Sequence, residues 1–138
     1  MELAFGTDER TVLTDDLVAA LGEQGHAVTV WADGDAWPVA GRAVGEAVAT
    51  GAARFGIVCC TTGTGVSIAA NKVPGVRAAL CTDAETARGA RRWNDANVLA
   101  FGLRLTTLAV ALEMVEAFVT TDPDPDERPL IDQVEAPG

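Results

Sequence analysis

The residues best placed to do chemistry in this chain are a cysteine and the glycine-rich turn after it. Cys60 ends an apolar run, and residues 61–65 read Thr-Thr-Gly-Thr-Gly. If a helix begins in this turn, its first backbone N–H groups favour an oxyanion, and the same field favours a thiolate. The candidate donors are the N–H groups of Thr62, Gly63, Thr64, Gly65 and Val66. The pattern predicts a reactive thiolate beside an anion site.

The cysteines also have a simpler interpretation as small core residues, and spacing alone favours it. Cys59 and Cys60 are neighbours, so in a strand their side chains point to opposite faces. The turn differs from the dinucleotide-binding pattern because it follows the third predicted strand, and it has no Walker lysine after Gly65. Three cysteines and one histidine make neither a disulfide framework nor a good zinc set, so we expect reduced thiols, no metal and no cofactor.

A parallel α/β sheet would position these residues. Short apolar runs alternate with helical patterns along the chain. The predicted strands are 3–6, 27–31, 55–60, 76–81 and 97–101, and the predicted helices are 15–24 (with Thr14 as N-cap), 38–50, 66–71, 83–92 and 106–119. This order predicts a Rossmann-like, doubly wound, five-stranded parallel sheet in a three-layer α/β/α fold. Such sheets bind ligands beyond the carboxyl ends of their strands.

Length and composition predict one domain over residues 1–121 and an acidic, proline-rich tail over 122–138. The chain has 138 residues, of which 49% are apolar, and its mean hydropathy is +0.19, so disorder is excluded for most of it. Prolines oppose a helix over 121–126, and a frayed end is the simplest interpretation of the tail. A net charge of −10 argues against nucleic acid. No apolar run approaches the roughly 20 residues of a membrane span, and no signal peptide is evident, so we expect a cytoplasmic protein.

Four segments resemble the family of ribose-5-phosphate isomerase B and galactose-6-phosphate isomerase. They are LAFGTD at 3–8, CTTGTGVSIAANK at 60–72, GVRA at 75–78 and WNDANVLAFG at 93–102, and they occur in the family's order over nearly the whole chain. The resemblance implies a Rossmann-like homodimer, or a tetramer, with active sites between subunits. It also implies metal-independent interconversion of aldose and ketose phosphates.

The resemblance further implies roles for individual residues. Moving a proton between adjacent carbons through an enediolate needs a base and donors around the developing oxyanion. In the cysteine branch of the family the base corresponds to Cys60, with Thr62 close by and the following amides as the anion hole. The substrate ligands correspond to Asp8, Asn94, Arg104 and Arg128, of which the last closes over the phosphate from the tail.

Three departures from the family pattern matter. One is Ala36-Trp37-Pro38, which stands where the family has Asp-Tyr-Pro, and the other two change the expected site. Glu9 stands where the family has a phosphate-contacting histidine, and a carboxylate repels a phosphate by about 4 kcal/mol per charge pair at 4 Å and an effective dielectric constant of about 20. Trp93 replaces the histidine assigned to opening the sugar ring, and an indole has no titratable nitrogen. His26 cannot substitute, because it lies at the amino-terminal edge of its strand. We therefore expect retained enolisation machinery with altered substrate recognition.

Three hypotheses follow for the function. The first is a metal-independent aldose–ketose isomerase of a sugar or sugar phosphate, with a cysteine base. The second is a catalytically inactive homologue that acts as a ligand-binding or partner subunit of a composite isomerase. The third is enolisation of a non-phosphorylated substrate. Simpler interpretations also exist: Glu9 is a solvated turn acid, and Trp93 and Trp37 are packing or interface residues.

Overall fold

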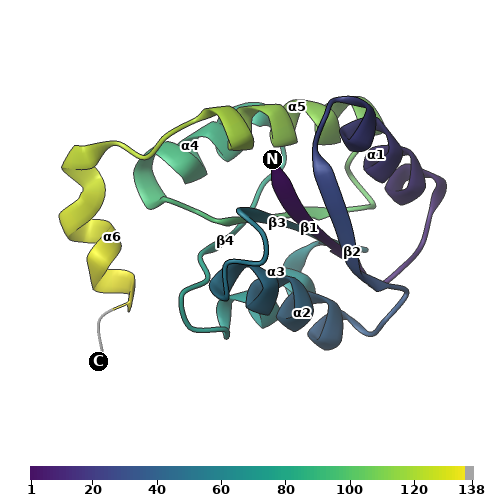
Figure 1. Cartoon of the computed structure of the whole chain (residues 1–138), viewed down its shortest axis with the longest axis horizontal. Helices are drawn as coiled ribbons and strands as arrows, with labels where there is room; N and C mark the ends of the chain where they lie inside the picture. Colours follow the sequence, from purple (N-terminus) through teal and green to yellow (C-terminus); the bar gives the residue numbers. More distant parts are fainter. Residues whose placement is uncertain (136–138) are drawn as a thin grey trace.

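Five parallel strands form the central layer of the structure, as the sequence predicts (Figure 1). They are β1 (Glu2–Thr7), β2 (Ala27–Asp33), β3 (Phe55–Cys60), β4 (Ala78–Leu80) and β5 (Val98–Gly102). The computed structural model describes residues 1–135 and orders the sheet β2-β1-β3-β5-β4. Because all neighbouring pairs are parallel, the carboxyl ends of β1, β3 and β5 meet at one edge. This edge is called the carboxyl edge below.

Helices cover both faces of the sheet, so the predicted three-layer, doubly wound architecture is confirmed. One face carries α1 (Val12–Glu23), α4 (Ala84–Asn94) and α5 (Leu108–Thr120), and the other carries α2 (Trp37–Ala49) and α3 (Thr64–Asn71) (Figure 1). In the described part of the chain, no helix has the length and apolar character that a membrane span requires.

The two faces of the sheet have cores of different character. The α1/α4/α5 side contains bulky residues such as Phe5, Phe101 and Phe118, whereas the α2/α3 side is built mainly from alanine and valine. Small residues let α2 and α3 pack closely: a Cβ on Gly41 would lie 2.7 Å from the Cβ of Ala69. Cys59 belongs to the first core and Cys60 to the second, so the predicted opposite orientation of these side chains is confirmed.

Several element boundaries differ from the predicted ones. Helix α1 begins at Val12 rather than Asp15, and its N-cap is Thr11 rather than Thr14. Thr11 Oγ1 accepts from the N–H of Thr14, while Thr14 Oγ1 accepts from the N–H of Thr11, which forms a reciprocal capping box. Strand β4 is only three residues long, where the apolar run predicted 76–81.

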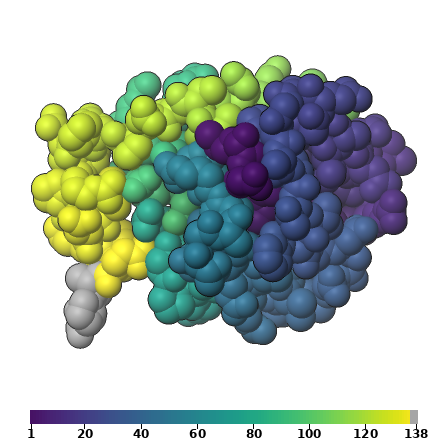
Figure 2. Space-filling model, viewed as in Figure 1, coloured from purple at the N-terminus to yellow at the C-terminus, as the bar shows by residue number. Residues whose placement is uncertain are grey.

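The tail is folded, so its interpretation as a frayed end is wrong for the described residues. A 3₁₀ turn, η1 (Pro125–Glu127), leads into α6 (Arg128–Glu135), which forms a lobe at the end of the molecule away from α1 (Figures 1 and 2). Pro125 and Pro129 occupy first-turn positions, where a helix needs no N–H donor. Ile131 anchors α6 with only 3% of its surface exposed. Residues 136–138 of the expected tail lie outside the described residues.

Candidate active site

Cys60 lies at the middle of the carboxyl edge. It is the last residue of β3, which runs between β1 and β5, and it pairs in register with Gly102. The N–H groups of Leu103 and Arg104 donate to the carbonyls of Cys60 (2.9 Å) and Thr61 (3.0 Å), so the loop after β5 is fixed beside the turn after β3. Cys60 is only 5% exposed and packs within the α2/α3 core, while its place at the strand end puts it next to the turn.

The turn after Cys60 requires glycine for steric reasons. Gly63 has a φ of 78°, and a Cβ there would lie 2.6 Å from Leu80 Cδ1 and from the backbone of Phe101. A Cβ on Gly102 would lie 2.8 Å from the backbone of Thr62. The turn and the end of β5 are therefore in direct backbone contact, which sets where α3 begins.

The first turn of α3 offers unused hydrogen-bond donors. Helix α3 begins at Thr64, and its N-cap is Gly63, which has no side chain to cap the helix. Within residues 1–135, the N–H groups of residues 62–66 donate to no protein acceptor, and the first helical bond runs from Ser67 N–H to the Gly63 carbonyl at 3.3 Å. Thr62 Oγ1 and Thr64 Oγ1 are exposed and hydrogen-bonded to each other at 2.8 Å. A developing oxyanion beside Cys60 would find several donors here.

Asp8 adds an acceptor to the same edge. It follows β1 directly, and the neighbouring residue Thr7 pairs in register with Cys59. Asp8 Oδ1 is buried and has no hydrogen-bond partner among the described residues. Burial raises the pKa of Asp8, and the charge of Glu9 raises it further, against the lowering effect of Asp8's own backbone N–H. An unpaired buried acceptor of this kind can bind a hydroxyl group.

Glu9 is exposed and is held by the backbone of its turn. Thr7 Oγ1 donates to the Glu9 carbonyl at 2.7 Å and accepts from the Glu9 N–H at 3.2 Å. These bonds fix the backbone at Glu9, while its carboxylate remains at the surface. The carboxyl edge therefore carries two adjacent acidic groups, Asp8 and Glu9.

The other two cysteines are unsuited to a base role. Burial raises the pKa of Cys59 to about 12, despite a hydrogen bond with Thr7 that lowers it, and the neighbouring Cys60 and Asp8 raise it further. Burial also raises the pKa of Cys81 to about 12, with a contribution from the charge of Asp83. Both are neutral core thiols at physiological pH.

Trp37 is a site neighbour that the sequence analysis treated only as a departure from the family pattern and a packing residue. Its indole covers the first turn of α3 so closely that a Cβ on Gly65 would lie 2.8 Å from the ring. The ring is partly exposed and forms a wall of the groove between α2 and α3. The signal in the sequence was a Trp-Pro pair, which begins α2 just after the loop that follows β2, a strand that also ends at the carboxyl edge.

Three predicted site residues lie elsewhere in the chain. Trp93 and Asn94 end α4, and Arg128 begins α6, all near the start of β5. From Val98 to Gly102, β5 itself spans about 13 Å at about 3.3 Å per residue. A single chain therefore presents two separate groups of predicted residues. The carboxyl-edge group contains Asp8, Glu9, Cys60, Thr62, Gly63, Thr64, Gly65, Val66 and Arg104.

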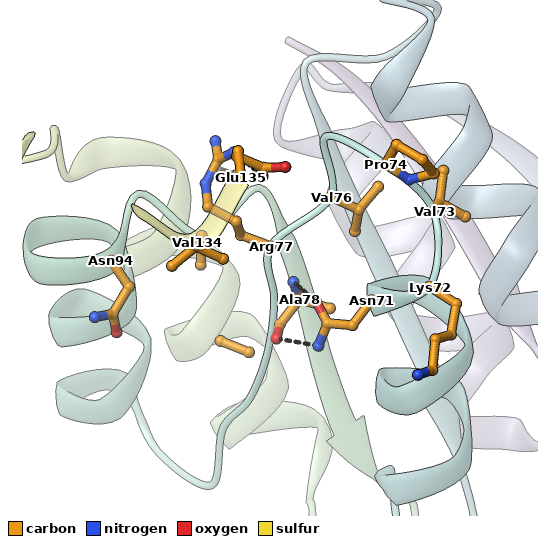
Figure 3. A pocket seen from close by; sticks show the side chains of 12 residues that line it. Asn71, Lys72, Val73, Pro74, Val76, Arg77, Ala78, Asn94, Val134 and Glu135 are labelled. Carbon is orange, nitrogen blue, oxygen red and sulfur yellow. Dashed lines mark hydrogen bonds and ion pairs between the residues drawn. The ribbon is translucent and has the colours of Figure 1, made fainter. Parts of the chain in front are cut away.

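The second group borders the edge strand β4. Trp93 is 55% exposed and packs over Gly89. Asn94 lines a cavity of about 520 Å³ together with Val134 and Glu135 of α6. Figure 3 shows Asn94 on one side of the segment that leads into β4 and Asn71 on the other. Asn71 donates to the Ala78 carbonyl (2.9 Å) and accepts from the Ala78 N–H (2.7 Å), which ties the end of α3 to this strand.

No metal-binding cluster is present in the described residues: nowhere in 1–135 do three or more His, Cys, Asp or Glu side chains group to hold an ion. The polar groups at the carboxyl edge are instead backbone donors, one thiol and carboxyl oxygens. These are suited to binding a hydroxylated, partly anionic molecule.

Comparisons with known proteins identify the family of this chain. The family model described as Ribose/Galactose Isomerase matches residues 3–132. Ribose-5-phosphate isomerase B of Escherichia coli is 40% identical over 123 residues, which cover 86% of this chain and 83% of that protein. Galactose-6-phosphate isomerase subunit LacB of Clostridium acetobutylicum is 43% identical over 83 residues, covering 60% of this chain and 48% of LacB.

The solved structure of Clostridium thermocellum ribose-5-phosphate isomerase B superimposes with a TM-score of 0.92 at 35% identity. The superposition covers 98% of this chain and 95% of the Clostridium thermocellum chain. The resemblance expected from the four sequence segments is thereby confirmed. The chain belongs to the ribose/galactose isomerase family of sugar-phosphate isomerases.

Proposed function

We propose that this chain is an aldose–ketose isomerase in which Cys60 is the catalytic base. The observation that carries the proposal is the place of Cys60 at the end of β3, directly before the turn in which the N–H groups of residues 62–66 are unused. The Cys60 thiolate takes the proton from the carbon next to the carbonyl, and the electron pair moves onto the carbonyl oxygen. The backbone donors stabilise the resulting enediolate. The thiol then returns the proton to the former carbonyl carbon, while the hydroxyl proton moves between the two oxygens.

The neighbouring polar groups bind the substrate in this proposal. The unpartnered Asp8 Oδ1 accepts a hydrogen bond from a sugar hydroxyl, and Thr62 lies beside the reacting oxygens. Arg104, fixed to the turn by its own N–H, supplies positive charge at the same edge. Each role uses a residue that follows a strand at the carboxyl edge, so substrate binding needs no rearrangement of the strands.

Substrate recognition is altered by the residues that replace the family histidines. Glu9 adds negative charge at the carboxyl edge, so a phosphate there depends on compensation by arginine. Trp93 offers an apolar surface and one N–H donor, so water or Asp8 must assist ring opening. The substrate is a sugar or sugar phosphate whose recognition relies more on hydroxyl contacts and ring stacking than in the related enzymes.

A second copy of the chain completes the site in our proposal. In one chain, Trp93, Asn94 and Arg128 lie at the opposite end of β5 from Cys60. A two-fold axis would bring this group of one copy to the carboxyl edge of the other and would create two equal sites. The exposed apolar side chains of Ile68, Leu80 and Trp93 are suitable for such an interface.

The Cys60→Ala variant tests the catalytic role. Loss of a general base lowers proton transfer by about 10²–10⁴-fold. We expect Cys60→Ala to lose incorporation of solvent deuterium at the carbon next to the carbonyl, measured by NMR with paired free and phosphorylated pentoses and hexoses. Cys59→Ala is the matched control, since it removes the adjacent thiol from the other face. Deuterium incorporation at the wild-type rate in Cys60→Ala would refute the mechanism.

An alternative is a partner subunit without activity of its own. Trp93 leaves the chain without the histidine of the family pattern, and the LacB relative is named as a subunit. In this case the purified chain alone shows no deuterium exchange, and activity appears only when a homologue that retains the histidine is added. Activity of the chain alone would exclude this function.

A further inference from the structure

Asp95 connects three arginines from three parts of the chain. It is the C-cap of α4 with a φ of 47°, and it directly follows Trp93 and Asn94. Its Oδ1 accepts from Arg91 Nη1 at 2.8 Å, and its Oδ2 accepts from Arg128 Nη2 at 2.8 Å and from Arg77 Nη2 at 3.4 Å. Arg77 precedes β4, Arg91 lies on α4, and Arg128 begins α6. One carboxylate thus links the end of α4 to the tail.

The same cluster binds the chain where the tail leaves α5 and again at the end of α6. Arg91, which is fully buried, donates through Nε to the carbonyl of Thr121, where the tail leaves α5. Arg77 Nη1 binds Glu135, the last residue of α6, at 3.0 Å. Helix α6 is therefore a docked element, because its first and last residues, Arg128 and Glu135, form ion pairs in the arginine–carboxylate cluster around Asp95.

We propose that Asp95 is a positioning residue that holds the guanidinium of Arg128 in a fixed relation to Asn94 and Trp93, so that all three meet an anionic sugar substrate together. This inference rests on the proposed function. Arg128 binds Asp95 through Nη2. Its Nη1 has only a long contact, 3.6 Å, with Asp132, so Nε and Nη1 can donate hydrogen bonds to a substrate anion. Binding then needs little further ordering of a long side chain.

The contacts of the other arginines make Arg128 the group most dependent on the Asp95 charge. Arg91 also donates to the carbonyls of Ala96 and Thr121, and Arg77 also donates to the backbone carbonyl of Asp95 and to Glu135. Within residues 1–135, Arg128 has only Asp95 and the more distant, exposed Asp132 as acidic partners. Burial opposes ionisation of Asp95, but the hydrogen bonds from Arg128 and Arg91 and the charges of Arg77 and Arg91 outweigh it and hold its pKa below the usual value.

The Asp95→Asn variant tests the proposal, because asparagine keeps the side-chain shape and tolerates the positive φ. We expect KM for a phosphorylated substrate to rise about tenfold, the loss of roughly one charge-assisted hydrogen bond, with kcat and its pH profile nearly unchanged. Amide hydrogens of α6 should exchange faster. Asp132→Asn is the matched control, and we expect it to change neither KM nor the amide exchange of α6.

Arg128→Gln separates positioning from folding effects. If Asp95 acts through Arg128, the double variant Asp95→Asn with Arg128→Gln has the same KM as Arg128→Gln alone. Additive losses in this cycle, or unchanged exchange of α6 in Asp95→Asn, would overturn the proposal. If the wild-type chain isomerises neither free nor phosphorylated sugars, the proposed function fails, and the positioning of Arg128 toward a substrate fails with it. If it isomerises free sugars only, the proposed function stands, and the positioning of Arg128 toward an anionic substrate is overturned. Hydrogen exchange then reports only how Asp95 anchors the tail.

Discussion

Subunit complementation tests directly whether the site is shared between two copies. One chain carries Cys60→Ala, and the other carries Asn94→Ala with Arg128→Ala. Each homodimer has lesions in both sites and is inactive. In a mixed dimer, one site receives both lesions, and the other receives none, because Cys60 and the Asn94/Arg128 group lie at opposite ends of β5. Random 1:1 reassociation makes half of the dimers mixed, so about a quarter of all sites are intact.

The assay measures isomerisation after the two inactive chains are dissociated together and reassociated. We expect recovery of about 25% of wild-type activity, with a wild-type KM. The control mixes Cys60→Ala with Arg104→Ala. Both residues belong to the carboxyl edge, so every site in that mixed dimer keeps one lesion, and no activity returns. No recovery in the first mixture, with mixed dimers verified by mass spectrometry, would refute the shared site.

Three further predictions concern stability. Gly63→Ala should lose about 2 kcal/mol or more in urea unfolding, and Gly75→Ala only about 1, because both have positive φ but only Gly63 is crowded; equal losses would contradict the steric account. Arg91→Met should lower the free energy of unfolding by about 3 kcal/mol, as measured by thermal unfolding. The variant removes the buried ion-pair partner of Asp95 and leaves the carbonyls of Ala96 and Thr121 without a donor. Asp8→Asn should stabilise the fold at pH 7. The pKa of Asp8 is raised in the folded state, so ionisation of Asp8 opposes folding at pH 7. The stabilisation by asparagine should vanish below about pH 4, where aspartate is protonated in both states. A difference in unfolding free energy that does not change with pH would contradict this.

The order of strands and helices was predictable because the strands are buried on both faces. Strand β3 is apolar throughout, and its six residues are all buried, as expected for the centre of a parallel sheet. The start of α1 was missed because its capping box uses two threonines, Thr11 and Thr14, in place of the usual pattern with Glu or Gln at the third position. Local patterns thus give the elements and leave their ends less certain.

The fold of the tail could not be predicted from local sequence. Helix α6 is short and polar, and prolines precede it. Its stability comes from burial of Ile131 and from ion pairs with Asp95 and Arg77, which are more than thirty residues away along the chain. The same limit applies to Trp37, whose contact with Gly65 joins the first turns of α2 and α3, which only the fold brings together.

The two residues that replace family histidines fall on different groups of the proposed shared site. Glu9 lies at the carboxyl edge, whereas Trp93 belongs to the group at the other end of β5. The proton-transfer part, Cys60 and the start of α3, lies within a single β3–α3 unit and contains neither change. Substitutions at both margins can therefore alter which sugar binds without moving the thiol or the backbone donors. For this reason we expect the reaction type to be retained and the substrate to differ.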